Sequence, residues 1–226
     1  QLAFNTVFGR NSVSQPLYPR FGSDFSLALE FTMPLSNWSG KNFSDMLDNE
    51  KYKWLEYYKW TFKASWFTSI IGDLVLNAKA EYGLVGFYNS DIGPSPFEGY
   101  EIGGDGMGYY VYGKSIVGLR GYENGSLTVS DGANIYSKYG LELRYPLTLS
   151  QSATIYALTF IEAGNGWNRF TKFNPFGLYR AGGVGVRVFL PMLGLLGIDW
   201  AYGFDKIPGA SEPSGSQFHF ILGQQF

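Results

Sequence analysis

The sequence predicts an all-β fold, in which antiparallel strands form the wall of a transmembrane β-barrel. Apolar and polar residues alternate with a period of two over runs of about ten residues, which is typical of strands with two different faces. Aromatic residues make up 19% and charged residues 16% of the chain, whereas soluble domains usually carry about 25% charged residues. The mean hydropathy of -0.09 fits such a wall, because lipid-facing and lumen-facing residues average out.

Four segments show this alternation clearly, and five more show it less regularly. The clear segments are residues 24–33, 58–70, 74–84 and 134–145, and the less regular ones are residues 2–9, 152–163, 180–190, 195–204 and 217–226. A strand needs about 9–11 tilted residues to span a bilayer, whereas strands of globular proteins average about 5–6 residues. Several of these segments reach the spanning length, so the pattern favours a barrel wall.

The connections between these segments alternate in length. We expect short turns at residues 71–73, 146–150 and 191–194, and long loops over residues 34–53, 89–131, 164–178 and 205–216. Outer-membrane barrels have short periplasmic turns and longer extracellular loops. The C-terminus is therefore expected on the periplasmic side, and residues 10–21 are expected to form a longer periplasmic link.

The segments number nine, and bacterial single-chain barrels almost always have an even number of strands. An open sheet edge in lipid would also leave backbone N–H and C=O groups unsatisfied. We therefore expect further strands before Gln1, with residues 1–226 forming the C-terminal part of a bacterial outer-membrane barrel. The alternative is a soluble β-sandwich or lipocalin-like barrel, which would expose large apolar side chains to water on strand after strand.

The composition argues against several other functions. The net charge of -2 gives no sign of nucleic-acid binding, and the absence of cysteine excludes disulfides and cysteine-based zinc sites. The glycine-rich residues 103–108 lack the flanking strand and helix of a nucleotide-binding motif, so they are predicted to form a flexible loop. His219 is the single histidine and no nucleophile motif points to it, which disfavours an outer-membrane phospholipase. No catalytic residue, metal or cofactor is expected.

The final segment has the pattern of a closing strand. Phe218, Phe220, Leu222 and Phe226 share one face. An amphipathic last strand with a terminal aromatic residue resembles the β-signal by which outer-membrane barrels are recognised for insertion. The alternative is an edge strand that ends in phenylalanine by coincidence. Gly223 interrupts the strand near its end, where glycine weakens pairing and favours bending.

The segment 89–131 is too long for a simple connection, because loops beyond about 12–15 residues usually have a function or are disordered. It contains the motif Leu119-Arg120-Gly121-Tyr122. This motif resembles the Val-Arg-Gly-Phe/Tyr motif in the sixth extracellular loop of the BamA family of outer-membrane protein assembly factors, and of its relatives in two-partner secretion and TamA-type assembly. In that family the loop folds back into the barrel lumen. Leu119 departs mildly from the family's first position.

Three further segments resemble the family in the same order: residues 139–146, 159–167 and 180–202. In the first, Glu142 matches a glutamate that contacts the motif arginine in the family. In the second, Ile161 replaces a tryptophan and Glu162 replaces an aspartate, so the negative charge is kept.

The residues agree with this resemblance on physical grounds. Alternation places Glu142 on the lumen-facing side of its strand, and Glu162 is expected there too. A guanidinium can hold carboxylates through charge-assisted hydrogen bonds, so Arg120 joined to both would anchor the loop inside the barrel. Gly121 would allow close backbone approach or a positive φ. The alternative is that Arg120 simply lies in an exposed loop.

The resemblance covers nearly the whole chain and corresponds to about the last nine strands of a 16-stranded barrel. It implies a non-enzymatic central subunit of the outer-membrane assembly machine (BAM complex), which inserts client β-barrel proteins through a lateral seam between its first and last strands. It also implies upstream POTRA domains, which are absent from this chain, and accessory lipoproteins and outer-membrane lipids as partners. The alternatives are a two-partner-secretion or TamA-type transporter and, from other classes, an outer-membrane phospholipase or a passive porin.

Overall fold

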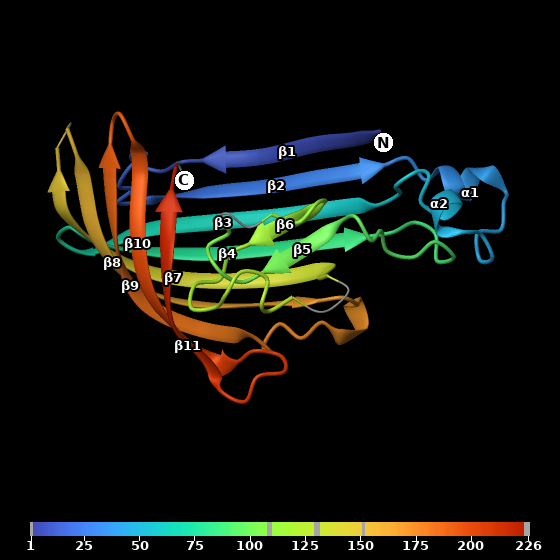
Figure 1. Cartoon of the computed structure of the whole chain (residues 1–226). Coiled ribbons are helices and arrows are strands. Elements are labelled where there is room, and N and C mark those ends of the chain that lie inside the picture. The colour runs from blue at the N-terminus through green and yellow to red at the C-terminus, as the bar shows by residue number, and fades with distance from the viewer. Residues whose placement is uncertain (1, 108–109, 129–131, 151, 224–226) are drawn as a thin grey trace.

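The computed structural model describes residues 2–107, 110–128, 132–150 and 152–223, which form one large antiparallel sheet (Figure 1). The nine strands of this sheet are ordered β1-β2-β3-β4-β7-β8-β9-β10-β11. Their bounds are Ala3–Asn11 (β1), Gly22–Thr32 (β2), Tyr58–Ile71 (β3), Leu74–Gly86 (β4), Ile135–Leu149 (β7), Thr154–Trp167 (β8), Tyr179–Leu190 (β9), Gly194–Lys206 (β10) and Pro213–Leu222 (β11). The predicted all-β class and antiparallel arrangement are confirmed.

Several strands are longer than the alternation predicts. The prediction of a turn at residues 146–150 is wrong, because β7 continues to Leu149. A register shift lies between Pro146 and Thr148, and such irregularities let a strand hold a residue that lacks an N–H. The strands β8 and β10 likewise extend into segments predicted as loops. The long strands reach the length needed to cross a bilayer.

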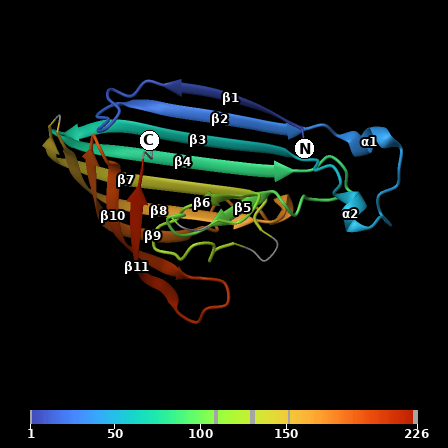
Figure 2. The same cartoon turned by 45° about the horizontal axis from the view of Figure 1, so that its top comes forward.

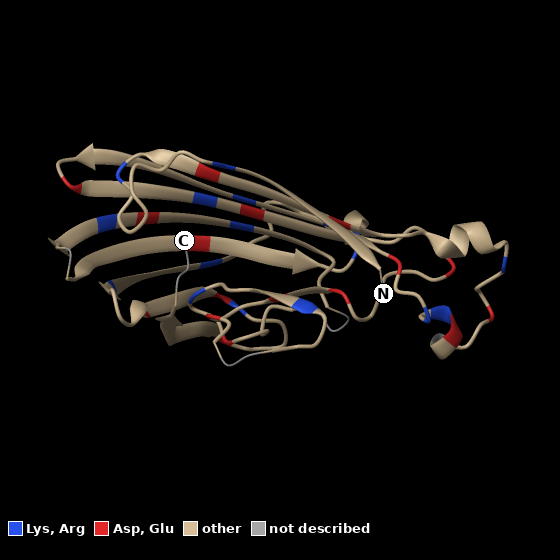
Figure 3. Cartoon of the chain, turned by 90° about the horizontal axis from the view of Figure 1, so that it is seen from above, with Lys and Arg blue, Asp and Glu red and all other residues tan. Residues whose placement is uncertain are grey.

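The sheet is strongly curved and has a convex and a concave face (Figures 1 and 2). Large apolar side chains are exposed on the same face of seven successive strands: Trp60, Tyr82, Leu141, Ile161, Val184, Trp200 and Phe218. Soluble monomers rarely expose so continuous an apolar surface. Charged positions occupy only short stretches of the strands (Figure 3). The exposed apolar face matches the lipid-facing side of a barrel wall.

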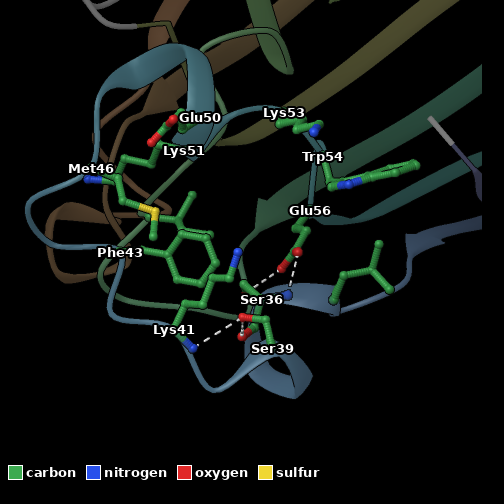
Figure 4. Close-up of a pocket in the computed structure, with 12 residues that line it drawn as sticks. Ser36, Ser39, Lys41, Phe43, Met46, Glu50, Lys51, Lys53, Trp54 and Glu56 are labelled. Carbon is green, nitrogen blue, oxygen red and sulfur yellow. Dashed lines mark hydrogen bonds between the residues drawn. The ribbon is translucent and has the colours of Figure 1, made fainter.

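The connection between β2 and β3 carries two short helices, α1 (Leu35–Ser39) and α2 (Asp48–Lys51). A pocket lies in this connection, where the Glu56 carboxylate accepts hydrogen bonds from N and Oγ of Ser36 at 2.7 and 2.5 Å (Figure 4). A 3-10 helix, η1 (Phe170–Lys172), follows β8. Within the described ranges, no helix has the length and apolar character needed to cross a membrane.

The connection between β4 and β7 folds over the concave face of the sheet (Figures 1 and 2). It is more ordered than the long loop that the sequence predicts, because β5 (Gly99–Ile102) and β6 (Lys114–Val117) pair in parallel within it. Buried residues of this connection pack with buried residues of the wall, and the shared cluster includes Tyr100, Leu119, Tyr122, Tyr136 and Ala181. The connection therefore fills part of the lumen side of the wall.

The link between β1 and β2 lies beside the turn between β3 and β4, at the end of the sheet opposite the connection between β2 and β3. Its Tyr18 is buried, and the hydroxyl donates to the carbonyls of Asp73 and Arg144 at 2.9 and 2.8 Å. Burial raises the pKa of Tyr18 to about 12. The Tyr18 ring packs edge-on against Tyr156. The extra length of this link thus lets the Tyr18 side chain reach the concave face of the sheet.

Candidate functional site

The motif segment 119–122 is held against the wall by its own backbone and by two apolar side chains. Leu119 and Tyr122 are both 0% exposed. The Leu119 carbonyl accepts a hydrogen bond from the N–H of Gly104 at 3.1 Å. The Tyr122 hydroxyl donates to the carbonyl of Arg180 on β9 at 2.7 Å. These contacts place Arg120 between two anchored neighbours.

Arg120 is buried and contacts carboxylates from three strands. Its Nη2 lies 2.8 Å from Oε1 of Glu142 and 2.5 Å from Oε1 of Glu162. Its Nη1 lies 2.9 Å from Oδ2 of Asp199, and its backbone N–H donates to Oε2 of Glu162 at 3.2 Å. The guanidinium also stacks over the Phe160 ring, 3.4 Å from its centre. Both terminal nitrogens of the guanidinium therefore have carboxylate partners.

Strand register explains why these carboxylates converge. Glu142 on β7 lies opposite Phe160 on β8, and Glu162 lies opposite Gly140, one step along the same face. Asp199 on β10 lies opposite Gly185 on β9. Because side chains alternate between faces, all three carboxylates point to the concave side. The loop supplies the arginine, and the wall supplies the acids.

Further cations neutralise the same carboxylates. Each acid has a basic partner of its own in the wall, namely Arg144 and Lys79 for Glu142, Lys138 for Glu162 and Arg187 for Asp199, at 2.5, 3.1, 3.7 and 2.6 Å. An uncompensated buried charge is costly, so a buried cluster of this kind requires every member to be paired. Burial lowers the pKa of Arg120, but Glu162 and Glu142 outweigh that effect and raise it above its ordinary value.

Gly121 allows the loop backbone to approach the wall closely. Its φ is +86°, and a Cβ there would lie 2.9 Å from both the Ala181 Cβ and the Gly203 N. Its N–H donates to Nε2 of His219 on β11 at 2.8 Å. Glycine is thus required for two reasons: the backbone conformation favours it, and the neighbouring Ala181 and Gly203 leave no room for a Cβ.

The structure brings Arg120, Glu142 and Glu162 together as the sequence predicts, but sequence reasoning missed Asp199. The signal was available in the alternation of residues 195–204. Leu195 and Ala201 share the buried face with Asp199. Asp199 is therefore a charge on the inward face of its strand, and such a residue needs a buried partner. The role of His219 as an acceptor for Gly121 was also missed, because no spacing rule links residues 98 positions apart.

The predicted closing-strand residues are not part of this cluster. Phe218, Phe220 and Leu222 are exposed on one face of β11. Gly223 follows the strand with φ of +103°, and its N–H still donates to the Leu195 carbonyl at 2.9 Å. Phe226 lies outside the described residues.

The ring nitrogens of His219 face Gly121 and Asp105, and neither partner is a nucleophile. Over the described ranges, no three histidine, aspartate or glutamate side chains are grouped so that they could hold a metal ion. The charged cluster joins the loop to the wall through Arg120 and its three carboxylate partners.

The fold resembles that of a solved protein, BamA. BamA from Haemophilus ducreyi, in a crystal structure lacking POTRA domains 1–3, matches with a TM-score of 0.65 and 20% sequence identity. The match covers 96% of this chain and 42% of that chain, so this chain spans less than half of that protein's length. A comparison with curated proteins found no match.

The sequence itself also matches a known family. The description of the matching family is the Omp85 superfamily domain, and the match runs over residues 1–226. Members of this family are bacterial outer-membrane proteins. The chain belongs to the Omp85 superfamily and has the fold of part of a BamA-like barrel.

Proposed function

We propose that this chain forms the C-terminal part of the barrel of an outer-membrane protein insertase, the central subunit of an assembly machine. One observation carries the proposal: the concave side of the wall is occupied by a loop that Arg120 joins to carboxylates of three strands. This loop obstructs a route through the lumen on this side of the wall, which favours a route along a seam between the first and last barrel strands.

The proposed mechanism uses backbone hydrogen bonding. An unfolded client strand cannot enter lipid alone, because its N–H and C=O groups would lack partners. A strand edge at a seam between the first and last barrel strands would supply those partners by β-augmentation. The reaction needs no nucleotide and no catalytic side chain. The wall's aromatic face would hold the protein in the bilayer while the seam opens.

The rest of the protein belongs to the same proposal. Further strands would complete a barrel of about sixteen strands, and periplasmic POTRA domains would precede them. The end of β11 would lie on the periplasmic side, next to the short turn between β9 and β10. Accessory lipoproteins and client barrel proteins would be the partners. A two-partner-secretion or TamA-type transporter is the second candidate, because such proteins belong to the same superfamily.

Reconstitution tests the proposal. The full-length protein that contains this chain is placed in liposomes with an unfolded client barrel, and protease protection reports where the client goes. We expect the client to fold in the bilayer faster than in protein-free liposomes. Entry of the client into the liposome interior would instead favour the transporter.

The same assay tests the arginine anchor. Arg120→Ala should slow client insertion and expose the loop to protease, and Arg120→Glu should do so more strongly, because it adds a carboxylate to an acidic site. Arg169→Ala is the matched control, since Arg169 is exposed. Unchanged insertion and unchanged loop cleavage in both Arg120 variants would contradict the anchoring role.

A further inference from the structure

The connection between β4 and β7 also contacts a lysine of β3, far from Arg120 in the sheet. Nζ of Lys59 donates to Oγ of Ser115 in β6 at 2.8 Å and to Oε2 of Glu98, just before β5, at 3.4 Å. The side chains of Lys59 and Glu98 are only 12% and 15% exposed. A buried ion pair depends on both partners, since either one alone would be an uncompensated charge. Lys59 therefore joins the connection to β3.

Tyr100 of β5 packs beside this lysine. Nζ of Lys59 lies 5.2 Å from the centre of the Tyr100 ring. The Tyr100 hydroxyl donates to the Trp60 carbonyl at 3.3 Å, and the ring packs edge-on against Tyr136 of β7 with the ring centres 4.5 Å apart. The tyrosine is only 1% exposed. Contacts with β3 and β7 thus position β5 over the wall.

The contacts of Lys59 and those of Arg120 lie on different parts of the wall. Lys59 belongs to β3, whereas Arg120 contacts acids of β7, β8 and β10. Two strands lie between β3 and β8 in the sheet, and four lie between β3 and β10. The sheet curves over this stretch, and the connection lies on its concave side (Figures 1 and 2). The partners of the lysine and of the arginine are different residues, so each attachment can be broken while the other is kept.

We infer that Lys59 is a second positioning residue for the loop, which thereby joins β3 to β8 and β10 across the concave face. With both ends attached, the wall changes its curvature between these strands only when one of the two charged contacts breaks. A loop that merely filled the space would not restrain the wall in this way. The inference concerns the loop and the wall alone, so it does not rest on the proposed insertase function.

Distances between spin labels test the two attachments separately. The chain has no cysteine, so introduced pairs of cysteines carry the labels, in the full-length protein in lipid nanodiscs. The pair Pro96→Cys and Ala64→Cys measures the distance from the loop to β3. The pair Glu123→Cys and Thr159→Cys measures the distance from the loop to β8. Ala64 and Thr159 lie on the convex face of the wall, and Pro96 and Glu123 are exposed.

Substitution of Lys59 should release the loop from β3 alone. In Lys59→Met, the distribution of the loop–β3 distance should broaden about twofold and that of the loop–β8 distance should stay unchanged, because the loss is local. Lys59→Arg should restore the narrow distribution, since a guanidinium can still pair with Glu98. Lys63→Met is the matched control, because Lys63 lies on the same strand and face but its side chain is 61% exposed.

A third pair of labels, at Ala64 and Thr159, measures the separation of β3 and β8 across the wall. Lys59→Met and Arg120→Ala should each broaden this distribution, and Lys63→Met should leave it unchanged. Broadening in both substituted proteins would support a restraint on the curvature of the wall, and an unchanged distribution in both would overturn it.

Two other outcomes would overturn the positioning role. One is a loop–β3 distribution that stays narrow in Lys59→Met. The other is equal broadening of the loop–β3 and loop–β8 distributions in that variant, since the loop would then be held as one unit. None of the distances involves a client protein, so a failure of client insertion would count against the insertase proposal alone.

Discussion

At the scale of single residues, the anchored loop depends on the pairing of one arginine with carboxylates from three strands. Glu142, Glu162 and Asp199 are almost fully buried, and each also has a basic partner in the wall. Breaking a buried ion pair by removing one partner typically costs about 3–5 kcal/mol, because the other charge is left uncompensated. The wall cations moderate that cost, but they cannot replace the contact between loop and wall. Arg120 therefore neutralises the buried carboxylates and also attaches the loop to the wall.

Gly121 provides a prediction that separates packing from backbone strain. Gly121→Ala should destabilise the loop by about 1–3 kcal/mol more than Gly209→Ala. Both glycines have nearly the same positive φ, +86° and +87°, but a Cβ at Gly209 meets nothing within 4 Å. Two measurements report the difference. One is the temperature at which the barrel unfolds, seen as loss of the faster gel mobility of the folded form. The other is protease cleavage of the loop. Equal effects of the two substitutions would show that close packing against Ala181 and Gly203 does not restrict the residue at position 121.

At the scale of elements, the end of β11 determines how the last strand can pair. Gly223 has a φ of +103°, which residues with a Cβ rarely adopt. Gly223→Val should force extended backbone, lengthen the pairing of the last strand and tighten the seam. Disulfide crosslinking between cysteines placed in the first and last barrel strands should then form faster, and client insertion should slow. Gly209→Val is the control, and identical seam opening in Gly223→Val and wild type would count against this role.

Alternation predicts elements well when one face of a strand contacts lipid. The strands β2, β3, β4 and β7 were all predicted from this pattern, since each repeats large apolar residues at every second position. The turn at residues 146–150 was mispredicted, because proline usually ends a strand, and the register shift that accommodates it depends on β8. The parallel pairing of β5 and β6 could not be predicted either. Four-residue strands carry too little pattern, and their contacts with the wall stabilise them.

Only part of the charged cluster could be predicted from the sequence. Glu142 and Glu162 could be matched to a motif, whereas the contact of Arg120 with Asp199 spans 79 residues and depends on the order of β7 to β10. Inward alternation identifies Asp199 as a residue that needs a partner. It does not identify the partner, because the loop's path over the sheet is set by packing of Leu119 and Tyr122 and not by local sequence.

At the scale of the whole molecule, connections between strands fill two regions on the concave side of the sheet. The motif loop fills one region, and Tyr18 from the link between β1 and β2 fills the other. On the proposed function, this arrangement obstructs passage through the lumen on this side of the wall. It also explains why the link between β1 and β2 is longer than the turns beside it.

The role of Tyr18 in filling the concave side can be tested by measuring conductance. Tyr18→Ala should increase ion leakage through the full-length protein in a planar bilayer, because the ring and its hydrogen bonds to the carbonyls of Asp73 and Arg144 are lost. Tyr18→Phe keeps the ring and should leak less than Tyr18→Ala. Tyr145→Ala, at an exposed tyrosine of β7, is the control. Conductance that is unchanged in Tyr18→Ala would show that the link does not close the barrel.

The distances along the chain within the arginine cluster have a consequence for folding order. Arg120 meets acids that follow it by 22, 42 and 79 residues. Contacts of such long sequence separation form late, because the intervening chain must first be placed. The loop therefore cannot lock until β7, β8 and β10 are all in register. The anchoring of the loop by Arg120 therefore marks the completion of this part of the wall.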